Sequence, residues 1–218
     1  MPSPSRRPMV AVATAALVLL PAGLATAAGP PLGSFVPDGF RVATTIRADI
    51  GGTPAADAVL VLVATPGTPQ DDGGPARAAR RLVLLKARAD GGFVQIGEGR
   101  RILLCTRCGG AFFGVARTPV TVRVRDGVVT VAQESGSRTV TSQRFRIRSE
   151  GATGTRLIGV DVRTRDRLTG AEVASRTNLL TGAREVVRTT ADGRRTVRRT
   201  TVPVRITPLE AVVAARYR

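Results

Sequence analysis

The stretch Val120–Val131 constrains the fold of this chain most strongly, because two runs of β-branched residues meet at Asp126-Gly127. Apolar and polar residues alternate along the first run, and Asp-Gly between two such runs is a strong signal for a two-residue hairpin turn. Successive side chains of a strand point to opposite faces, so Arg123 and Arg125 share the face that the valines of this run do not use. The stretch therefore predicts a β-hairpin with one aliphatic face and one basic face.

Further strand patterns follow this hairpin at roughly regular spacing, which is typical of an all-β meander, sandwich or barrel. Leu168-Thr169-Gly170-Ala171 recurs twelve residues later as Leu180-Thr181-Gly182-Ala183. This separation suits one strand plus one turn, so we expect both copies to form hairpin corners. Upstream, Ala58–Ala64 is continuously apolar, which indicates a strand covered on both faces.

The fold class expected from these patterns is all-β, an antiparallel meander that forms a sandwich or a partly open barrel. A single β domain is expected over residues 40–206, with two lobes that meet near residue 118 as an alternative arrangement. Residues 28–39 are rich in proline and glycine and predict an irregular lead-in. A threonine, a proline and a glutamate at 207, 208 and 210 match a helix start, so we expect a short C-terminal helix over Pro208–Arg216 within residues 207–218.

Residues 1–27 have the pattern of a secretory signal peptide. Arg6 and Arg7 precede an apolar core over Val10–Leu20, and Ala25-Thr26-Ala27 supplies a small-x-small cleavage site. The apolar core is shorter than the roughly 20 residues that span a bilayer, which disfavours a membrane anchor. We therefore expect export to an extracytoplasmic location, periplasmic or secreted, and no membrane span after cleavage.

The chain carries 33 basic and 16 acidic residues, a formal net charge of +17 at pH 7. A charge this high favours polyanionic partners, such as anionic lipid, acidic polysaccharide or nucleic acid. Single-stranded nucleic acid is disfavoured because its bases stack on aromatic side chains, and the chain has no Trp and one Tyr. The alternative is a solvated arginine-rich surface that binds nothing.

Arginines alternate with aliphatic residues in several of the expected strands, which predicts that they gather on one outer sheet face. The neighbouring acidic residues are too few to pair all of them. Guanidinium groups bind phosphate or carboxylate through charge-assisted hydrogen bonds. The candidate anion-binding residues are Arg123, Arg125, Arg144, Arg146, Arg148, Arg163 and Arg165.

Cys105-Thr106-Arg107-Cys108-Gly109-Gly110 is the most specific short motif of the chain. In an exported chain, Cys105 and Cys108 favour a local disulfide that pins a tight loop. A thiol–disulfide redox site is the alternative, although Gly109-Gly110 disfavours the helix of a thioredoxin-like site. The chain has no histidine, which excludes a Ser-His-Asp or Cys-His nucleophile and a histidine metal site. We expect no enzymatic activity and no cofactor.

Asp49 and Asp57 flank a Gly/Pro-rich loop between two strand patterns. A strand–loop–strand unit of this kind can hold calcium when it supplies six to eight oxygen ligands. Gly51 has no ligand to offer, Thr53 offers a hydroxyl group only, and Pro54 replaces a glycine. The loop therefore predicts a degenerate calcium site, with Asp49 and Asp57 as its candidate ligands.

Phe40–Val63 resembles the first unit of the FG-GAP loops in integrin-alpha-like β-propeller blades, where an Asp-rich calcium loop precedes an apolar strand. Four downstream motifs resemble a group of secreted bacterial proteins that follow a degenerate FG-GAP start with a cysteine-Gly-Gly loop and a β-rich tail. These motifs are Leu104–Gly110, Asp126–Val131, Leu157–Asp161 and Asn178–Gly182. The resemblance spans most of residues 36–190 and implies an exported β-rich protein without an established activity. Only one such loop is present, so we expect no complete propeller.

These observations favour a non-enzymatic extracytoplasmic β protein that binds anionic cell-envelope or other polyanionic partners through its arginine-rich sheet face. Two alternatives stay open. One is a structural or assembly protein without a ligand, and the other is a redox protein that uses Cys105 and Cys108. The oligomeric state is open in all three.

Overall fold

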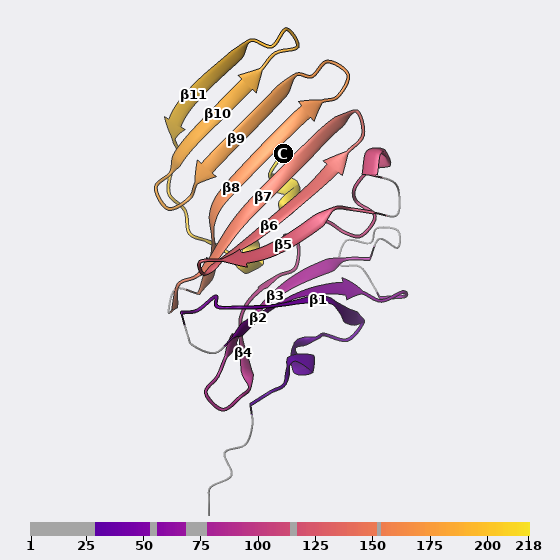
Figure 1. Ribbon diagram of the computed structural model, residues 1–218, viewed down its shortest axis with the longest axis vertical. Coiled ribbons are helices and arrows are strands. Elements are labelled where there is room, and N and C mark those ends of the chain that lie inside the picture. Colours follow the sequence, from indigo (N-terminus) through magenta and orange to yellow (C-terminus); the bar gives the residue numbers. More distant parts are fainter. Residues whose placement is uncertain (1–28, 53–55, 69–77, 114–116, 152–153) are drawn as a thin grey trace, which may run out of the picture.

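The chain folds into two antiparallel β-sheets that pack face to face, as a computed structural model shows for residues 29–52, 56–68, 78–113, 117–151 and 154–218 (Figure 1). The smaller sheet has the strand order β1-β2-β3-β4, and the larger sheet has the order β11-β10-β9-β8-β7-β6-β5. Each of these strands therefore pairs with its neighbours in sequence. The expected all-β meander is confirmed, and it forms an open sandwich and not a closed barrel. The expected signal peptide lies outside the described residues.

The strands of the smaller sheet are β1 (Phe40–Ala48), β2 (Asp57–Ala64), β3 (Arg80–Ala87) and β4 (Phe93–Gly99). Those of the larger sheet are β5 (Val120–Arg125), β6 (Val128–Gly136), β7 (Thr139–Ser149), β8 (Thr155–Asp166), β9 (Glu172–Asn178), β10 (Ala183–Thr189) and β11 (Arg195–Thr201), and a short β12 (Thr207–Pro208) also pairs with β8. The 3₁₀ helices are η1 (Leu32–Phe35), η2 (Ala111–Phe113), η4 (Leu209–Ala211) and η5 (Ala214–Arg216). None of the described helices is long and apolar enough to cross a membrane.

Strand β2 is buried along its whole length, as its continuous apolar sequence predicts. On one face, Val59 and Val61 join the core that lies between the two sheets. On the other face, Leu60 and Leu62 pack beneath η1 and the residues that follow it. The smaller sheet is therefore the middle layer, with the larger sheet on one side and the N-terminal segment on the other.

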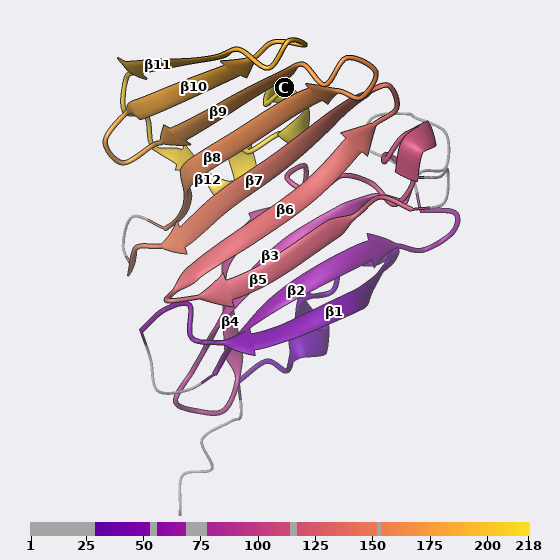
Figure 2. The ribbon, with the colours of Figure 1, turned by 45° about the horizontal axis from the view of Figure 1, so that its top comes forward.

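Strands β5–β8 close the central core from the opposite side. Val131, Phe145, Ile147 and Val160 are fully or almost fully buried against the smaller sheet. Among the described residues, β9, β10 and β11 contribute no buried hydrophobic side chain. Two views show these three strands at the end of the larger sheet farthest from β1–β4 (Figures 1 and 2). The larger sheet therefore extends beyond the core as an overhang.

Two buried glutamines on the inner face tie distant segments to the sheet. The side-chain amide of Gln133 on β6 donates to the side-chain oxygen of Gln143 on β7 over 2.9 Å. Gln133 also bonds the backbone of Ile102 and Leu104, and the amide of Gln143 donates to the carbonyls of Ala214 and Tyr217. The pair thus fixes both the connection between the sheets and the C-terminal segment.

The helical C-terminal segment expected over Pro208–Arg216 consists of two 3₁₀ turns. Val212 adopts an extended ψ of 121° after the first turn. Val213 then forms a parallel bridge with Arg101, and the N–H of Ala214 donates to the carbonyl of Arg101 over 2.9 Å. This pairing with the connection between the sheets interrupts the helix, so β12, η4 and η5 together cover the core at the inner face of β8.

The turns follow their sequence signals. Asp126 and Gly127 both have positive φ values, 51° and 71°, which a two-residue hairpin loop of the primed type requires. The strands pair from Arg125 and Val128 onward. The predicted hairpin over Val120–Val131 is confirmed.

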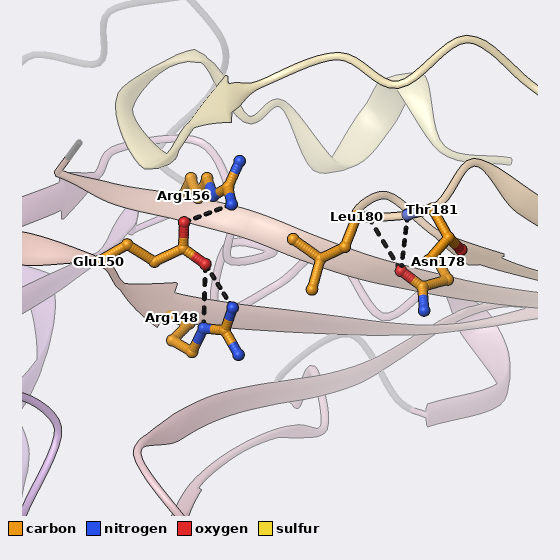
Figure 3. A network of polar contacts seen from close by, with 6 residues as sticks. All are labelled: Arg148, Glu150, Arg156, Asn178, Leu180 and Thr181. Carbon is orange, nitrogen blue, oxygen red and sulfur yellow. Dashed lines mark hydrogen bonds and ion pairs between the residues drawn. The ribbon is translucent and has the colours of Figure 1, made fainter.

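The repeated Leu-Thr-Gly-Ala sequence forms the same corner twice, at β8–β9 and at β9–β10. In one copy Asp166 accepts the N–H groups of Leu168 and Thr169. In the other, the side chain of Asn178 accepts the N–H groups of Leu180 and Thr181 (Figure 3). The N–H groups of Thr169 and Leu168, with a smaller effect of Arg138, hold the pKa of Asp166 below its usual value.

Gly182→Ala tests how the second corner is packed. Gly170 and Gly182 have φ values of +76° and +73°, and a Cβ on Gly182 would lie 2.2 Å from the carbonyl oxygen of Val202, whereas a Cβ on Gly170 would meet nothing within 4 Å. We expect Gly170→Ala to cost about 1–2 kcal/mol through backbone strain. Gly182→Ala should cost about 1–2 kcal/mol more, because it displaces the Val202 N–H that bonds the Gly182 carbonyl. Urea unfolding of both variants measures the difference, and equal losses would contradict the contact with Val202.

Gln143→Met tests the buried amide pair. Methionine fills a similar volume but leaves the carbonyl of Tyr217 and one amide proton of Gln133 without partners, while the carbonyl of Ala214 keeps only the N–H of Tyr217. Buried polar groups without a partner cost about 1–3 kcal/mol each, so we expect the free energy of unfolding to fall by at least about 2 kcal/mol. The matched control is Gln95→Met at an exposed position of β4, which should change it by less than about 0.5 kcal/mol. Equal effects of both substitutions would contradict a stabilising role for the pair.

Candidate anion-binding face

The seven arginines predicted to bind anions all lie on the outer face of the larger sheet, the face turned away from β1–β4. On β7 they alternate with the buried side chains of Gln143, Phe145 and Ile147. On β5 and β8 they alternate with valines that pack against the core. The pleat therefore directs the arginines outward because their neighbours in sequence fill the interior.

The strand register extends this face to arginines on β9 and β11. A single row across the sheet places Arg144 opposite Asp161, and Asp161 opposite Arg176. The same row continues to Glu185 on β10 and Arg199 on β11. Charges thus alternate in sign over five adjacent strands. Such cross-strand pairs stabilise a sheet, whereas like charges directly opposite one another destabilise it.

Asp161 of this row forms its best-defined ion pair with Arg146, which lies in the neighbouring row opposite Gly159. Two guanidinium nitrogens of Arg146 donate to the two carboxylate oxygens of Asp161, both over 2.8 Å. Gly159 makes this possible, because a Cβ there would lie 2.7 Å from the Nε of Arg146. The arginine therefore lies across the bare backbone of β8, and Asp161 is engaged by it rather than by its register partners.

The arginines of the face divide into paired and unpaired groups. Arg163 pairs with Glu172, Arg199 with Glu185, and Arg125 with Asp126 at the exposed hairpin tip. Within the described part of the chain, no carboxylate pairs with the guanidinium groups of four others, namely Arg123, Arg144, Arg165 and Arg176. The face therefore carries a surplus of positive charge that the acidic residues of the face do not neutralise.

The unpaired arginines Arg144 and Arg176 lie beside two adjoining open hollows of about 840 Å³ and about 430 Å³. Both hollows are lined by Arg144, Asp161 and Arg176. Small outer-face side chains, Ala174 in one and Ala183 in the other, leave room between the arginines. This arrangement offers hydrogen-bond donors and positive charge around a depression that is open to solvent.

Glu150 bridges two further arginines at one end of the face (Figure 3). Arg148 donates to one carboxylate oxygen of Glu150 through two nitrogens, at 3.0 Å and 2.5 Å, and Arg156 pairs with the other oxygen. These contacts, with Arg148 first, lower the pKa of Glu150 below its usual value. The cluster links the end of β7 to the start of β8.

Cys105 and Cys108 form a disulfide, as the sequence predicts. The loop that contains it is tied to its surroundings by backbone contacts: the N–H of Thr106 donates to the carbonyl of Ala78, and that of Gly136 on β6 donates to the carbonyl of Gly109. A Cβ on Gly110 would lie 2.4 Å from the carbonyl oxygen of Gly136. The two glycines therefore allow the loop to pack closely against the larger sheet.

The carboxylates of Asp49 and Asp57 are bonded to backbone N–H groups. Asp49 accepts from Gly51 and Gly52, and the fully buried Asp57 accepts from Ile50 and from Ala87 on β3. Residues 53–55 of the expected calcium loop lie outside the described residues. Within the described residues, no group of three or more Asp, Glu, His or Cys residues could hold a metal ion. Calcium binding by this loop stays a prediction.

The sequence reasoning did not include Arg176 and Arg199 in the candidate face. Both lie in the alternating segments of β9 and β11, but only the register shows that they continue the row of Arg144 and Asp161. The sequence patterns also did not indicate Arg156. A register shift between Arg146 and Ile147 brings Arg156 opposite Arg148 and so onto the same face. Counting residues from the repeated corner between β8 and β9 would have found Arg176.

Glu150→Gln tests the ion-pair cluster through its pH dependence. Because the pKa of Glu150 is lower in the folded protein, its charge stabilises the fold above the unfolded pKa of about 4.3. This stabilisation is lost as the pH falls through the folded value. We expect the wild type to be more stable than the variant at pH 7, with a difference that disappears at low pH in urea unfolding. Asp126→Asn is the control, because its pair with Arg125 is almost fully exposed and such pairs contribute little. A difference that is constant from pH 7 to pH 3 would contradict the ion-pair explanation.

Comparison with protein-family models, with curated proteins and with solved structures finds no match to this chain. The resemblance to FG-GAP proteins therefore stays a prediction.

Proposed function

We propose that this chain is a non-enzymatic, extracytoplasmic protein that binds an acidic polysaccharide or a similar linear polyanion across the outer face of its larger sheet. The observation that carries the proposal is the pair of guanidinium groups of Arg144 and Arg176, which flank Asp161 in one row and have no carboxylate partner within the described residues. Charge-assisted hydrogen bonds to carboxylate or sulfate groups would satisfy them.

The spacing of the unpaired arginines supports a polymer as the partner. Arg123, Arg144 and Arg176 lie on β5, β7 and β9, so each is two strands from the next. Neighbouring strands are about 4.8 Å apart, which separates these positions by about 10 Å across the sheet. A polymer with repeated negative charges can contact several of them at once. The hollowed surface around Arg144 and Arg176 suits a linear polymer better than it suits the flat surface of a membrane.

The chemistry of the face supports binding rather than catalysis. Asp161, Glu172 and Glu185 are all engaged by arginines, and a carboxylate held in this way is a poor general base. The chain has no histidine to take that role. The expected export of the chain rests on the sequence of residues 1–27 and is part of the proposal.

The packing of the Cys105–Cys108 loop supports a structural role for its disulfide in place of the redox alternative. The loop lies within the connection from β4 to β5 that joins the two sheets, and Gln133 holds the backbone just before it at Leu104. Opening the disulfide for thiol exchange would disturb these contacts. We therefore assign the binding function to the arginine face alone.

Replacing Arg144 and Arg176 together with glutamine tests the proposal. We expect the double variant to elute from a heparin column at lower salt than the wild type and to bind polygalacturonate at least about 10-fold more weakly, because two charge-assisted contacts are lost. Thermal stability should change little, since neither side chain has an ion-pair partner among the described residues. Binding of the wild type should weaken steeply as salt rises.

The matched control is Arg41→Gln with Arg107→Gln, which removes the same charge from exposed positions on β1 and in the disulfide loop. If both double variants lose affinity equally, net charge and not the outer face explains retention, and the proposal is wrong. If neither loses affinity, the outer-face arginines do not hold the polyanion and the proposal is wrong. A wild type that binds neither heparin nor polygalacturonate would favour the structural alternative without a ligand.

A further inference from the structure

The inner face of the overhang has a further hollow, on the opposite side of the sheet from the arginine face. It has a volume of about 690 Å³ and is lined by residues of β8, β9, β10 and β11 and by Arg218. This volume lies within the range of about 300–1,000 Å³ that is typical of small-molecule sites. It exists because the smaller sheet covers β5–β8 and leaves β9–β11 without a layer beneath them.

The polarity of this hollow changes from one side to the other. In one row of the sheet, Val162 on β8 is followed by Ser175, Val186 and then Arg198 on β11. In the next row, Val173 on β9 is followed by Arg188 and then Thr196. Val162 and Val173 therefore lie on the core side of the hollow, where Val162 packs against the core. Arg184, Arg188 and Arg198 lie on β10 and β11 toward the free edge of the sheet, with Val186 between Arg184 and Arg188 on β10.

The charge of this hollow is of one sign. None of the described residues that line it is acidic. Arg188 and Arg198 form no ion pair within the described residues. Each lines this hollow and neither of the two outer-face hollows beside Arg144 and Arg176. In contrast to the outer face, where carboxylates compete for the arginines, the lining of this hollow has no acidic side chain.

We propose that this hollow binds a single anionic amphiphile, with an aliphatic tail against Val162, Val173 and Val186 and a carboxylate or phosphate head between Arg188 and Arg198. Charge complementarity requires an anion in this hollow, because its charged side chains are all arginines. A second copy of the chain does not fit as the occupant, because a two-fold contact would place the arginines of one copy against the same arginines of the other, and like charges repel. The valines argue against a small inorganic anion, which would leave them in water. The proposal is independent of polyanion binding on the outer face.

Calorimetric titration of the full chain with sodium dodecanoate below its micelle concentration tests the proposal. We expect saturable binding of one dodecanoate per chain. Acetate has the same head without a tail, and dodecyl maltoside has the same tail with a neutral head, so both should bind at least 10-fold more weakly. Absence of dodecanoate binding would overturn the proposal, as would equal binding of acetate or of dodecyl maltoside.

Two double variants locate the site. Arg188→Gln with Arg198→Gln should weaken dodecanoate binding at least 10-fold, while Arg144→Gln with Arg176→Gln, which removes the same charge from the outer face, should change it less than two-fold. Val173→Thr with Val186→Thr should also weaken dodecanoate binding, and far-UV circular dichroism checks that these variants fold. Equal losses in the two arginine variants would assign binding to net charge and overturn the site.

Heparin retention separates this proposal from the one for the outer face. Arg188→Gln with Arg198→Gln should elute with the charge-matched control Arg41→Gln with Arg107→Gln. Elution at the lower salt of the outer-face variant would mean that the inner-face hollow and the outer face belong to one polyanion surface, and would overturn a separate amphiphile site.

Discussion

The two-residue period of the pleated strand is the constraint on which the rest of this structure depends. In β5–β8 it sends one row of side chains into the core and the next row to the outer face, where the arginines lie. A slip of one residue in any of these strands would exchange the two rows. It would bury several guanidinium groups, at a cost far above that of losing a few aliphatic contacts. The gain from burying the valines and the cost of burying the arginines therefore favour the same strand register.

The core that enforces this register is held together by polar contacts as well as by aliphatic packing. Gln133 and Gln143 occupy inner-face positions of β6 and β7 that the pattern reserves for apolar residues. Their amides bond to each other and to the backbone of the connection between the sheets and of the C-terminal segment. A buried amide with all its partners can specify one arrangement, because any other arrangement would leave it unsatisfied. These two side chains therefore link three segments that are far apart in the sequence.

The same sheet has two faces with different electrostatic character. On the outer face, arginines and carboxylates alternate across the strands, and most acidic groups are engaged by a neighbouring arginine. On the inner face of the overhang, the row from Val162 to Arg198 passes from aliphatic to cationic without an acidic residue. The difference follows from the width of the smaller sheet, because strands beyond its edge need no apolar inner face. Their inner positions are free to carry arginine and threonine.

Much of this fold could be predicted from local signals. The Asp126-Gly127 turn, the repeated corners and the alternation in β5 and β7 depend only on neighbouring residues, and all of them are present. The continuous apolar run of β2 correctly indicated cover on both faces. The helix start at Thr207–Glu210 was read from equally local signals, but Val213 pairs with Arg101, and this long-range contact divides the segment into two turns.

The sequence by itself determined which side of each strand carries the arginines, because the side-chain alternation of a strand is a local geometric property. Only the tertiary structure decided which arginines are neighbours, since Arg144, Asp161, Arg176, Glu185 and Arg199 come together through strand register. It also decided which strands lie over the core and which extend beyond it. Both depend on how far one sheet covers the other, and no pattern within a single strand records that distance.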